Sequence, residues 1–335
     1  MLSRRALLLS AVASLPLRAA FPLGAALPLR AAAATPPFAD GRVVTIVVPF
    51  AAGGGSDIVA RMIAPPLSEA LKVPVVIENR PGAGSVLAAR YVKGMRPDGT
   101  TLLFVDMGFS AGASLDKQAR YHPIKDFEAI ASAASVSSIL TVKQASAYRS
   151  LADLVAAAKK RSGAMSMASG GIGGTAHLIG AMFAEQAGFE PTHVPYRGMG
   201  PAMTDVLSGQ TDFLIATAPV ALPYIRDSRV AGLAVASAER LDLLPQISTF
   251  GQQGYPGIVA DNVYGFVAPA GVPAPVTAIL HREITAIVRS EAFADRLAPL
   301  AARPLPMGTP QAYGAFLEGD FTKWREVIQR NNVAP

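Results

Sequence analysis

Short apolar runs alternate with helical periods along the chain from residue 43 onward. The segment VVTIVVPF (43–50) is almost continuously apolar, which predicts a strand buried on both faces of a sheet. After it, Ile58, Val59, Met62 and Ile63 fall on one face of a helix. Strand–helix–strand alternation with short loops favours a mostly parallel α/β sheet. In the same part of the chain we predict strands over 74–79 and 101–106 and a helix over 85–93.

A second α/β set follows the extended, apolar stretch 126–142. Pro201 is expected at the first position of one of its helices, where a missing N–H costs nothing, and Gly209 lies past the end of that helix. The predicted helices are 151–160, 175–188 and 201–209, and the predicted strands are 164–169, 191–196, 211–216 and 230–237.

Another extended stretch, 262–271, precedes a mainly helical C-terminal part whose last helix opens at Thr309-Pro310. We detect no internal sequence repeat. Two α/β sets linked by two extended segments predict two lobes joined by a two-strand hinge. The predicted lobe 1 comprises residues 35–138 and 265–335, and the predicted lobe 2 comprises 139–264.

The first 34 residues differ from the rest of the chain. A basic start with Arg4 and Arg5, a short apolar run and a small-residue end predict a secretory signal peptide over 1–34. This segment carries four arginines and no acidic residue, so its removal lowers the net charge from +6 to +6 − 4 = +2. A chain of that charge, without basic runs interleaved with aromatics, is not expected to bind nucleic acid. The Arg4-Arg5 pair leaves twin-arginine and ordinary Sec export both open.

The sequence contains no cysteine. An exported protein without cysteine forms no disulfides and carries no lipid on an N-terminal cysteine, so we do not expect a lipoprotein. The histidines, His122, His177, His193 and His281, show no metal-ligand spacing. We therefore predict neither a metal site nor a cofactor.

Three glycines, Gly53 to Gly55, stand between the first predicted strand and its helix. A phosphate-binding loop needs a lysine after its last glycine, and a dinucleotide fingerprint needs a glycine where Ile58 stands. Asp57 at the helix start would also repel a pyrophosphate. An N-cap role for Ser56 or Asp57 is the structural alternative, although capping does not require three glycines.

Two other turns, 80–85 and 169–175, also join a strand to a helix, and Thr175 is expected to be the N-cap of the second. Each turn presents backbone N–H groups at the positive end of a helix, which together form a small-anion site. One exposed helix end contributes about 0.3–1 kcal/mol, whereas micromolar binding requires about −8 kcal/mol. Several turns must therefore converge, and neutral donors of this kind favour a carboxylate ligand.

Catalytic motifs are weak by comparison. The sequence has no GxSxG elbow and no cysteine nucleophile. Ser169 and His177, eight residues apart across a helix start, are not expected to form a hydrolase dyad. A buried, hydrogen-bonded structural role is favoured for His177, and Phe109 is left open between the ligand site and the core.

Six sequence blocks follow one another from about residue 40 to the C-terminus: VPFAAGGGSDIVAR, VIENRPGAG, PDGTTLLF, ASGGIGGTAHLIG, HVPYRGMGPAMTDVLSGQTDF and GFVAPAGVP. In this order they resemble the tripartite tricarboxylate transporter substrate-binding proteins, also called Bug or TctC-like receptors. The resemblance implies a periplasmic type II solute-binding fold, with two lobes that each hold a mostly parallel sheet flanked by helices. It also implies a monomeric receptor, not an enzyme, that binds a di-, tri- or aromatic carboxylate and delivers it to a membrane permease.

The resemblance also implies a binding site in the glycine turns and the loops near them. The PY[KR]G block of the family corresponds to Tyr196-Arg197-Gly198, and the aspartate before the next strand is Asp212. The residues predicted to bind ligand are Phe50, Ala51, Gly54, Gly55, Ser56, Asp57, Gly84, Met107, Phe109, Ser169, Gly170, Gly173, Gly174, Thr175, His177, Tyr196, Arg197, Asp212 and Thr217.

Three departures from the family pattern modify this expectation. Ile172 and the apolar stretch 213–219 replace residues that are polar in many relatives, which favours an apolar distal pocket and an aromatic or longer aliphatic acid. Pro65-Pro66 is expected to kink or restart the first helix. Phe109 brings a large aromatic near the cleft. Two other functions stay open: an exported enzyme that acts on an organic acid, and a ligand sensor that partners a signalling protein.

Overall fold

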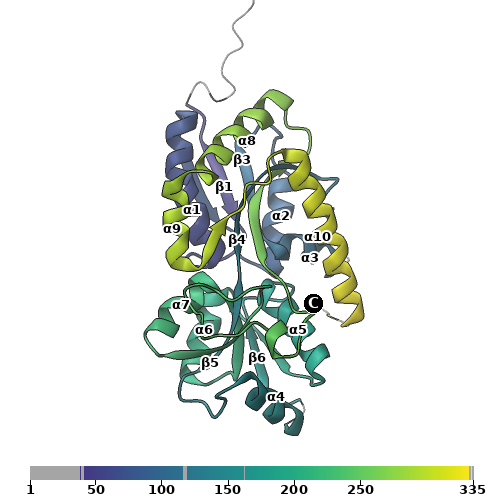
Figure 1. Cartoon of the computed structure of the whole chain (residues 1–335). Coiled ribbons are helices and arrows are strands. Elements are labelled where there is room, and N and C mark those ends of the chain that lie inside the picture. The colour runs from purple at the N-terminus through teal and green to yellow at the C-terminus, as the bar shows by residue number, and fades with distance from the viewer. Residues whose placement is uncertain (1–37, 39–40, 116–118, 162, 332, 334–335) are drawn as a thin grey trace, which may run out of the picture. The chain divides into compact units, whose positions relative to one another are not determined.

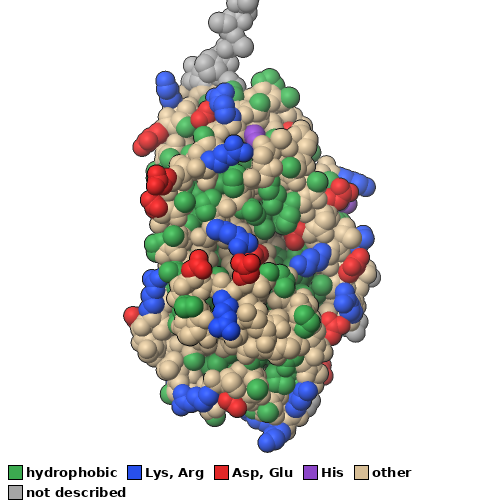
Figure 2. All heavy atoms as spheres, viewed as in Figure 1, with side chains coloured by type: hydrophobic (Ala, Val, Ile, Leu, Met, Phe, Trp, Pro, Cys, Tyr) green, Lys and Arg blue, Asp and Glu red, His purple; other side chains and the backbone are tan. Residues whose placement is uncertain are grey.

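The computed structural model describes residue 38 and residues 41–115, 119–161, 163–331 and 333 (Figure 1). The predicted signal peptide lies outside the described residues. No helix in the described part of the chain is long and apolar enough to cross a membrane. On the face shown in Figure 2, basic and acidic side chains are interspersed rather than gathered by sign.

The strands form two separate sheets, as predicted. The first sheet has the order β11-β4-β10-β3-β1-β2, and the second has the order β7-β6-β8-β5-β9. The strands of the first sheet are β1 (Val44–Val48), β2 (Val75–Asn79), β3 (Thr101–Val105), β4 (Phe127–Val136), β10 (Asn262–Pro269) and β11 (Ala302–Pro304). Those of the second are β5 (Ser138–Lys143), β6 (Ser166–Ser169), β7 (Thr192–Pro195), β8 (Phe213–Thr217) and β9 (Val230–Val235).

Each sheet mixes parallel and antiparallel pairs. Strands β2, β1 and β3 pair in parallel, as do β7, β6 and β8, because helices connect successive strands of each set along the chain. Two of the strands at the crossings between the sheets, β10 and β5, run the other way. Strand β10 pairs antiparallel with β3 and β4, and β5 pairs antiparallel with β8 and β9.

The chain passes from the first sheet to the second within one residue. Strand β4 ends at Val136, β5 begins at Ser138, and only Ser137 stands between them. The chain returns at β10, whose first residue, Asn262, pairs with Val136. These two crossings lie side by side and link the two lobes of the fold (Figure 1). The lobe boundaries at 138/139 and 264/265 stay a prediction.

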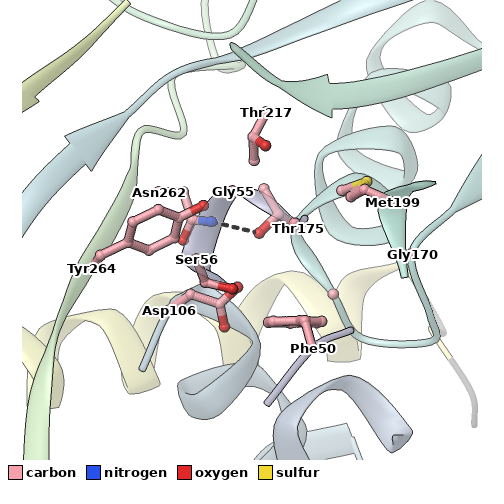
Figure 3. A pocket seen from close by; sticks show the side chains of 12 residues that line it. Phe50, Gly55, Ser56, Asp106, Gly170, Thr175, Met199, Thr217, Asn262 and Tyr264 are labelled. Carbon is pink, nitrogen blue, oxygen red and sulfur yellow. Dashed lines mark hydrogen bonds between the residues drawn. The ribbon is translucent and has the colours of Figure 1, made fainter. Parts of the chain in front are cut away.

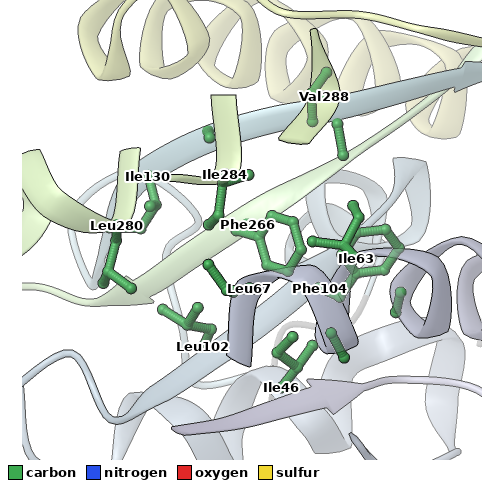
Figure 4. Packing of buried hydrophobic residues seen from close by; sticks show 14 of the residues in the cluster. Ile46, Ile63, Leu67, Leu102, Phe104, Ile130, Phe266, Leu280, Ile284 and Val288 are labelled. Atoms are coloured by element: carbon green, nitrogen blue, oxygen red, sulfur yellow. The ribbon is translucent and has the colours of Figure 1, made fainter. Parts of the chain in front are cut away.

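Helices cover both faces of each sheet. Between the first sheet and helices α1 and α8, one apolar cluster includes Ile63, Phe104, Phe266 and Leu280 (Figure 4). A second cluster packs α2, α3 and α10 on the opposite face of that sheet. The helices are α1 (Gly55–Leu71), α2 (Val86–Lys93), α3 (Met107–Leu115), α4 (Leu151–Lys160), α5 (Thr175–Ala187), α6 (Met199–Ser208), α7 (Ala218–Arg226), α8 (Ala274–Val288), α9 (Glu291–Leu297) and α10 (Pro310–Arg330).

The predicted elements are confirmed to within two residues at their ends. Two helix predictions are wrong. Helix α1 does not restart at Pro65-Pro66: it runs from Gly55 to Leu71, and Ile63, Ala64 and Leu67 remain packed in the core on both sides of the pair. Helix α6 begins at Met199 behind Gly198, so Pro201 is its third residue and not its first. Helices α3 and α7 and the short strand β11 were not predicted.

Candidate functional site

The first glycine turn follows β1 and leads directly into α1. Gly53 has a left-handed backbone (φ +81°), and Gly54 is the extended N-cap residue, with φ −74° and ψ 162°. No side chain caps this helix, so the predicted cap role of Ser56 or Asp57 is wrong. Asp57 is the third helical residue, and its Oδ2 accepts a hydrogen bond from the N–H of Gly53 at 2.9 Å. The first N–H groups of α1 are thereby left for a ligand.

Asp57 fixes the backbone of the first turn through the hydrogen bonds of its side chain. Its carboxylate also accepts hydrogen bonds from Arg61 Nε at 3.0 Å and Asn79 Nδ2 at 2.9 Å, and Asn79 donates in turn to the carbonyl of Phe50. The Asp57 side chain is buried, which alone would raise its pKa. The hydrogen bonds from Arg61, Gly53 and Asn79 outweigh burial, so the pKa lies below its usual value. Asp57 is thus a structural carboxylate within the turn.

The second glycine turn, between β6 and α5, repeats this geometry. Gly173 is left-handed (φ +73°), and Gly174 is the extended N-cap residue, with φ −78° and ψ 169° and no side-chain cap. Thr175 is the first helical residue, so its predicted N-cap role is wrong. Here the N–H of Gly173 donates to Nδ1 of His177 at 3.1 Å. Asp57 and His177 therefore occupy equivalent positions, four residues after the left-handed glycine, an equivalence that the sequence did not reveal.

His177 is supported by a second histidine. The rings of His177 and His193 stack with centroids 3.7 Å apart, and His193 Nε2 lies 2.6 Å from Ser169 Oγ. Burial lowers the pKa of His177 to about 3 and that of His193 to about 4, with the neighbouring ring contributing at His177. Both rings are neutral near pH 7. Ser169 pairs with His193 and not with His177, and it is fully buried.

The third turn, residues 80–85, packs against the second. Gly84 has φ +55°, and a Cβ built on it would lie only 2.2 Å from the carbonyl oxygen of Ile172. Ser85 Oγ points toward Asp106 Oδ1, at 3.3 Å. The turn therefore belongs to the contact between the two lobes, and only a glycine permits this approach.

A small cavity of about 30 Å³ lies where the first and second turns meet (Figure 3). A void of this size holds about two water molecules. Asn262 crosses it, because Oδ1 accepts from the N–H of Met107 at 2.9 Å and Nδ2 donates to Thr175 Oγ1 at 3.0 Å. The cavity is lined by Phe50, Gly54, Gly55, Ser56, Asp106, Gly170, Gly174, Thr175, Met199, Thr217, Asn262 and Tyr264.

A larger cavity of about 360 Å³ shares Phe50 and Gly170 with the small one. The second and third turns form most of its wall. Arg197 is the charged residue among its lining residues, and it is exposed. The other lining residues are Pro81, Gly82, Ala83, Gly84, Leu87, Gly171, Tyr196 and Gly198.

The predicted site residues divide into two groups. Those that line one or both cavities are Phe50, Gly54, Gly55, Ser56, Gly84, Gly170, Gly174, Thr175, Tyr196, Arg197 and Thr217. Those that do not are Ala51, Asp57, Met107, Phe109, Ser169, Gly173, His177 and Asp212.

The side chains of Phe109 and Asp212 line neither cavity and have other partners. Phe109 is fully buried in the core, stacked on Tyr121 at 5.6 Å between ring centroids. Asp212 precedes β8, at the opposite end of that strand from Thr217, and its carboxylate accepts from the N–H and Oγ of Ser166.

The apolar stretch after Asp212 is also structural. Phe213, Leu214 and Ile215 are fully buried in β8, and only Thr217 beyond them reaches the small cavity. The expected apolar distal wall therefore does not come from this stretch. Phe50, Leu87 and Tyr196 supply the large apolar surfaces of the larger cavity instead.

Four residues that line the small cavity were not predicted: Asp106, Met199, Asn262 and Tyr264. In the larger cavity, Pro81, Gly82, Ala83, Leu87, Gly171 and Gly198 were not among the predicted site residues. Asp106 follows the carboxyl end of β3, the same edge at which the first turn follows β1, and this placement was a usable signal. Asn262 and Tyr264 come from the crossing strand β10. Burial raises the pKa of Asp106 to about 6, against the hydrogen bonds from Asn262, Gly108 and Ser85. Asp106 is the charged residue among those that line the small cavity, and none of them is basic.

The chain is similar to a known protein family and to proteins of known structure. The model of the "Tripartite tricarboxylate transporter family receptor" family matches residues 59–333. A UPF0065 protein from the tcbD-tcbE intergenic region of Pseudomonas sp. (strain P51) is 32% identical over 288 residues, covering 86% of this chain and 85% of the relative. The structure of the periplasmic binding protein BugD superposes with a TM-score of 0.84 at 32% identity, covering 88% of this chain and 99% of that one. The R. palustris protein Rpa4515 with adipate gives a TM-score of 0.84 at 31% identity, covering 88% and 98%.

Proposed function

The chain belongs to the tripartite tricarboxylate transporter receptor family, and on that premise we propose that it binds a small organic carboxylate between its two equivalent glycine turns. The family is one of periplasmic receptors and not of enzymes, as the sequence predicted. For delivery we propose the membrane subunits of a tripartite tricarboxylate transporter, with the receptor acting as a monomer.

One observation carries the proposed ligand class. Two helices without side-chain caps, α1 and α5, begin at one small cavity that has no basic residue in its lining. Backbone N–H groups at helix starts bind carboxylates well, and each partly buried helix end contributes up to about 2 kcal/mol. Adipate in a relative 31% identical to this chain supports the same class of ligand.

The two cavities suggest how the ligand is arranged. A carboxylate group fits the small cavity, whose volume is about 30 Å³, and the rest of the molecule extends into the larger one. Phe50 lines both and would lie against the middle of the ligand. Leu87 and Tyr196 favour an aliphatic or aromatic body, and Arg197 lies where a second carboxylate would end.

Ligand exchange requires the lobes to part, because so small a cavity admits no acid from outside. We propose that residues 35–138 with 265–335 move as one lobe and 139–264 as the other. The crossings at Ser137 and at the start of β10 act as the hinge. In the closed form, Asn262 of β10 hydrogen-bonds Thr175 of α5 across the small cavity.

A thermal-shift screen tests the proposal. The mature protein is heated with aliphatic mono-, di- and tricarboxylates, aromatic carboxylates, amino acids and phosphate esters, each at pH 6 and pH 8. A carboxylate present at 100 times its Kd adds about 2.7 kcal/mol to the unfolding free energy, which raises Tm. A response to phosphate esters alone, or to nothing in the panel, would overturn the proposed function.

A pair of variants then tests the site. Gly84→Ala puts a methyl group 2.2 Å from the carbonyl oxygen of Ile172 and should keep the turns apart, so the affinity for the best carboxylate falls by more than tenfold. Gly163→Ala is the matched control, because Gly163 has a similar backbone (φ +73°) with nothing within 4 Å of the new methyl. It should bind as the wild type does. Equal affinities of the two variants would exclude the proposed closure.

A further inference from the structure

Asp106 places an acidic group inside the proposed carboxylate site. It stands between β3 and α3, and its side chain is 6% exposed. Oδ1 accepts hydrogen bonds from the N–H of Gly108 at 2.9 Å and from Ser85 Oγ at 3.3 Å. The carboxyl group lies beside Ser56 on the wall of the small cavity (Figure 3).

A ligand carboxylate in the same cavity would lie close to that group. A void of about 30 Å³ leaves no more than a few ångströms between its contents and its walls. Two negative charges only a few ångströms apart repel each other strongly there, because the site is largely closed to water. The helix starts of α1 and α5 favour one anion in the cavity. No residue that lines the cavity supplies a positive charge that would stabilise a second anion.

A proton between the two carboxyl groups removes this conflict. Two carboxylates that share a site raise the pKa of one of them strongly. Burial, against the hydrogen bonds that lower it, already brings the pKa of Asp106 to about 6 without a ligand, and a bound anion raises it further. The protonated acid also gains a role, because its O–H donates a hydrogen bond that an ionised carboxylate cannot offer.

We propose that Asp106 binds the ligand as a neutral carboxylic acid that donates a hydrogen bond to the ligand carboxylate, so that the receptor takes up one proton with each ligand. The proton comes from solvent and resides on Asp106; no covalent bond forms or breaks. This inference rests on the proposed function and names the residue that is protonated when the ligand binds. It selects acids without a nearby ammonium group, because an ammonium would pair with the ionised form of Asp106 instead.

Other titratable groups near Asp106 have to be separated from it. Helix α10 contributes Asp320 and Tyr313, and β10 contributes Tyr264. Asp320 is the one that titrates in the same range, because burial raises its pKa to about 6 despite a hydrogen bond from Trp324 Nε1 at 2.7 Å. The nearby third turn and α5 present hydroxyl groups, those of Ser85 and Thr175, which do not titrate there.

The test is calorimetric titration of the whole mature protein with adipate at pH 6, 7 and 8, each in two buffers of different ionisation enthalpy. The difference in observed binding enthalpy between the two buffers gives the number of protons taken up per ligand. The wild type should take up about one proton per adipate at pH 7 to 8, and its affinity should rise up to about tenfold for each unit that the pH falls toward 6. Asp106→Asn keeps a hydrogen-bond donor and should bind adipate with no proton uptake and no pH dependence. Asp320→Asn is the matched control and should retain the proton uptake of the wild type.

Each result decides between distinct outcomes. Adipate binding by the wild type without proton uptake would overturn the inference, and this measurement stands even if Asp106→Asn does not fold. If glutamate binds more tightly as the pH rises and adipate does not bind, Asp106 pairs in its ionised form with the ammonium group of the ligand. That result would also overturn the inference. Loss of proton uptake in Asp320→Asn would mean that the proton is taken up by Asp320 on α10 and not by Asp106. Silence of the entire carboxylate panel would instead defeat the proposed function on which the inference rests.

Discussion

The first glycine turn, residues 49–57, and the second, residues 169–177, have matching backbones held by different chemistry. In both, a left-handed glycine precedes an extended N-cap glycine, and a side chain four residues later accepts the N–H of the left-handed one. Asp57 in the first turn is ionised and joined to Arg61 and Asn79. His177 in the second is neutral and stacked on His193.

This difference shows which part of each turn the function requires. The N–H groups at the helix start are equivalent in the two lobes, whereas the side chains that fix them differ in charge. A carboxylate site of this kind needs only that the backbone be held still, and an ion pair or a stacked histidine serves equally. The two supports should nevertheless fail under different conditions, which allows the comparison to be tested.

The largest expected effect is at Asp57. Asp57→Ala removes a buried acceptor from the N–H of Gly53 and from Asn79, and leaves Arg61 without its ion-pair partner. We expect a loss of about 2–3 kcal/mol in unfolding free energy, measured by urea titration. Carboxylate affinity should fall as well, because the first turn is no longer fixed.

Asp153→Ala is the matched control for that variant. Asp153 is also the third residue of its helix, α4, and accepts from the N–H of Arg149 at 3.1 Å, but it is exposed and lies outside both cavities. Its loss should cost less than about 1 kcal/mol. Equal costs at Asp57 and Asp153 would mean that burial of the Asp57 network adds nothing.

The second turn should respond to mild acid. Histidines that are buried and neutral in the folded state bind protons more readily once unfolded, so stability falls as the pH drops below about 6.5, toward the folded pKa values of about 4 and about 3. The slope is at most about 1.4 kcal/mol per pH unit for each histidine. His193→Gln should reduce the slope of urea-derived stability between pH 6.5 and 4.5, and an unchanged slope would contradict the assignment.

The first turn should not share this sensitivity. The pKa of Asp57 is lowered in the folded state, so its contribution is present above its unfolded pKa near 3.8 and is lost only as the pH falls below that value. Asp57→Ala should therefore shift stability by a constant amount between pH 6.5 and 4.5. A shift that varied with pH in this window would mean that the two supports are not independent.

The smallest expected effect is at the two N-cap glycines. A methyl group on Gly54 would lie 3.4 Å from the carbonyl oxygen of Ala51, and one on Gly174 would lie 3.4 Å from that of Gly171. Each alanine substitution should cost about 0.5–1 kcal/mol by thermal unfolding, because alanine is a poorer N-cap residue than glycine. The two costs should agree to within about 0.5 kcal/mol. Gly200→Ala, where nothing lies within 4 Å, is the control and should not destabilise the protein.

Local signals in the sequence were enough to predict the elements and the turns. Apolar runs, glycines and the Thr309-Pro310 start of α10 act over a few residues, and the structure confirms them. The predicted restart at Pro65-Pro66 does not occur because tertiary packing along α1 outweighs the local preference of proline.

The cavity lining was harder to predict because it depends on contacts between distant segments. Asn262 reaches Met107 across 155 positions and Thr175 across 87, and no short pattern indicates either contact. Phe109 was uncertain for the same reason. Whether its ring faces the cleft or the core is decided by Tyr121 and Phe127, which pack against it. The equivalence of Asp57 and His177 could not be predicted, because two residue types that share no charge accept the same backbone hydrogen bond.

The direct passage from β4 to β5 also has a consequence for chain entropy. Pairing Val136 with Asn262 closes a loop of 262 − 136 = 126 residues, which contains the whole second sheet. The entropy lost on closing a loop grows only with the logarithm of its length, by about 0.6 kcal/mol for each doubling. Closing this loop therefore costs only about 2 kcal/mol more than closing one of about 12 residues. A complete second lobe can thus sit between neighbouring strands of the first at a cost comparable to that of one buried hydrogen bond.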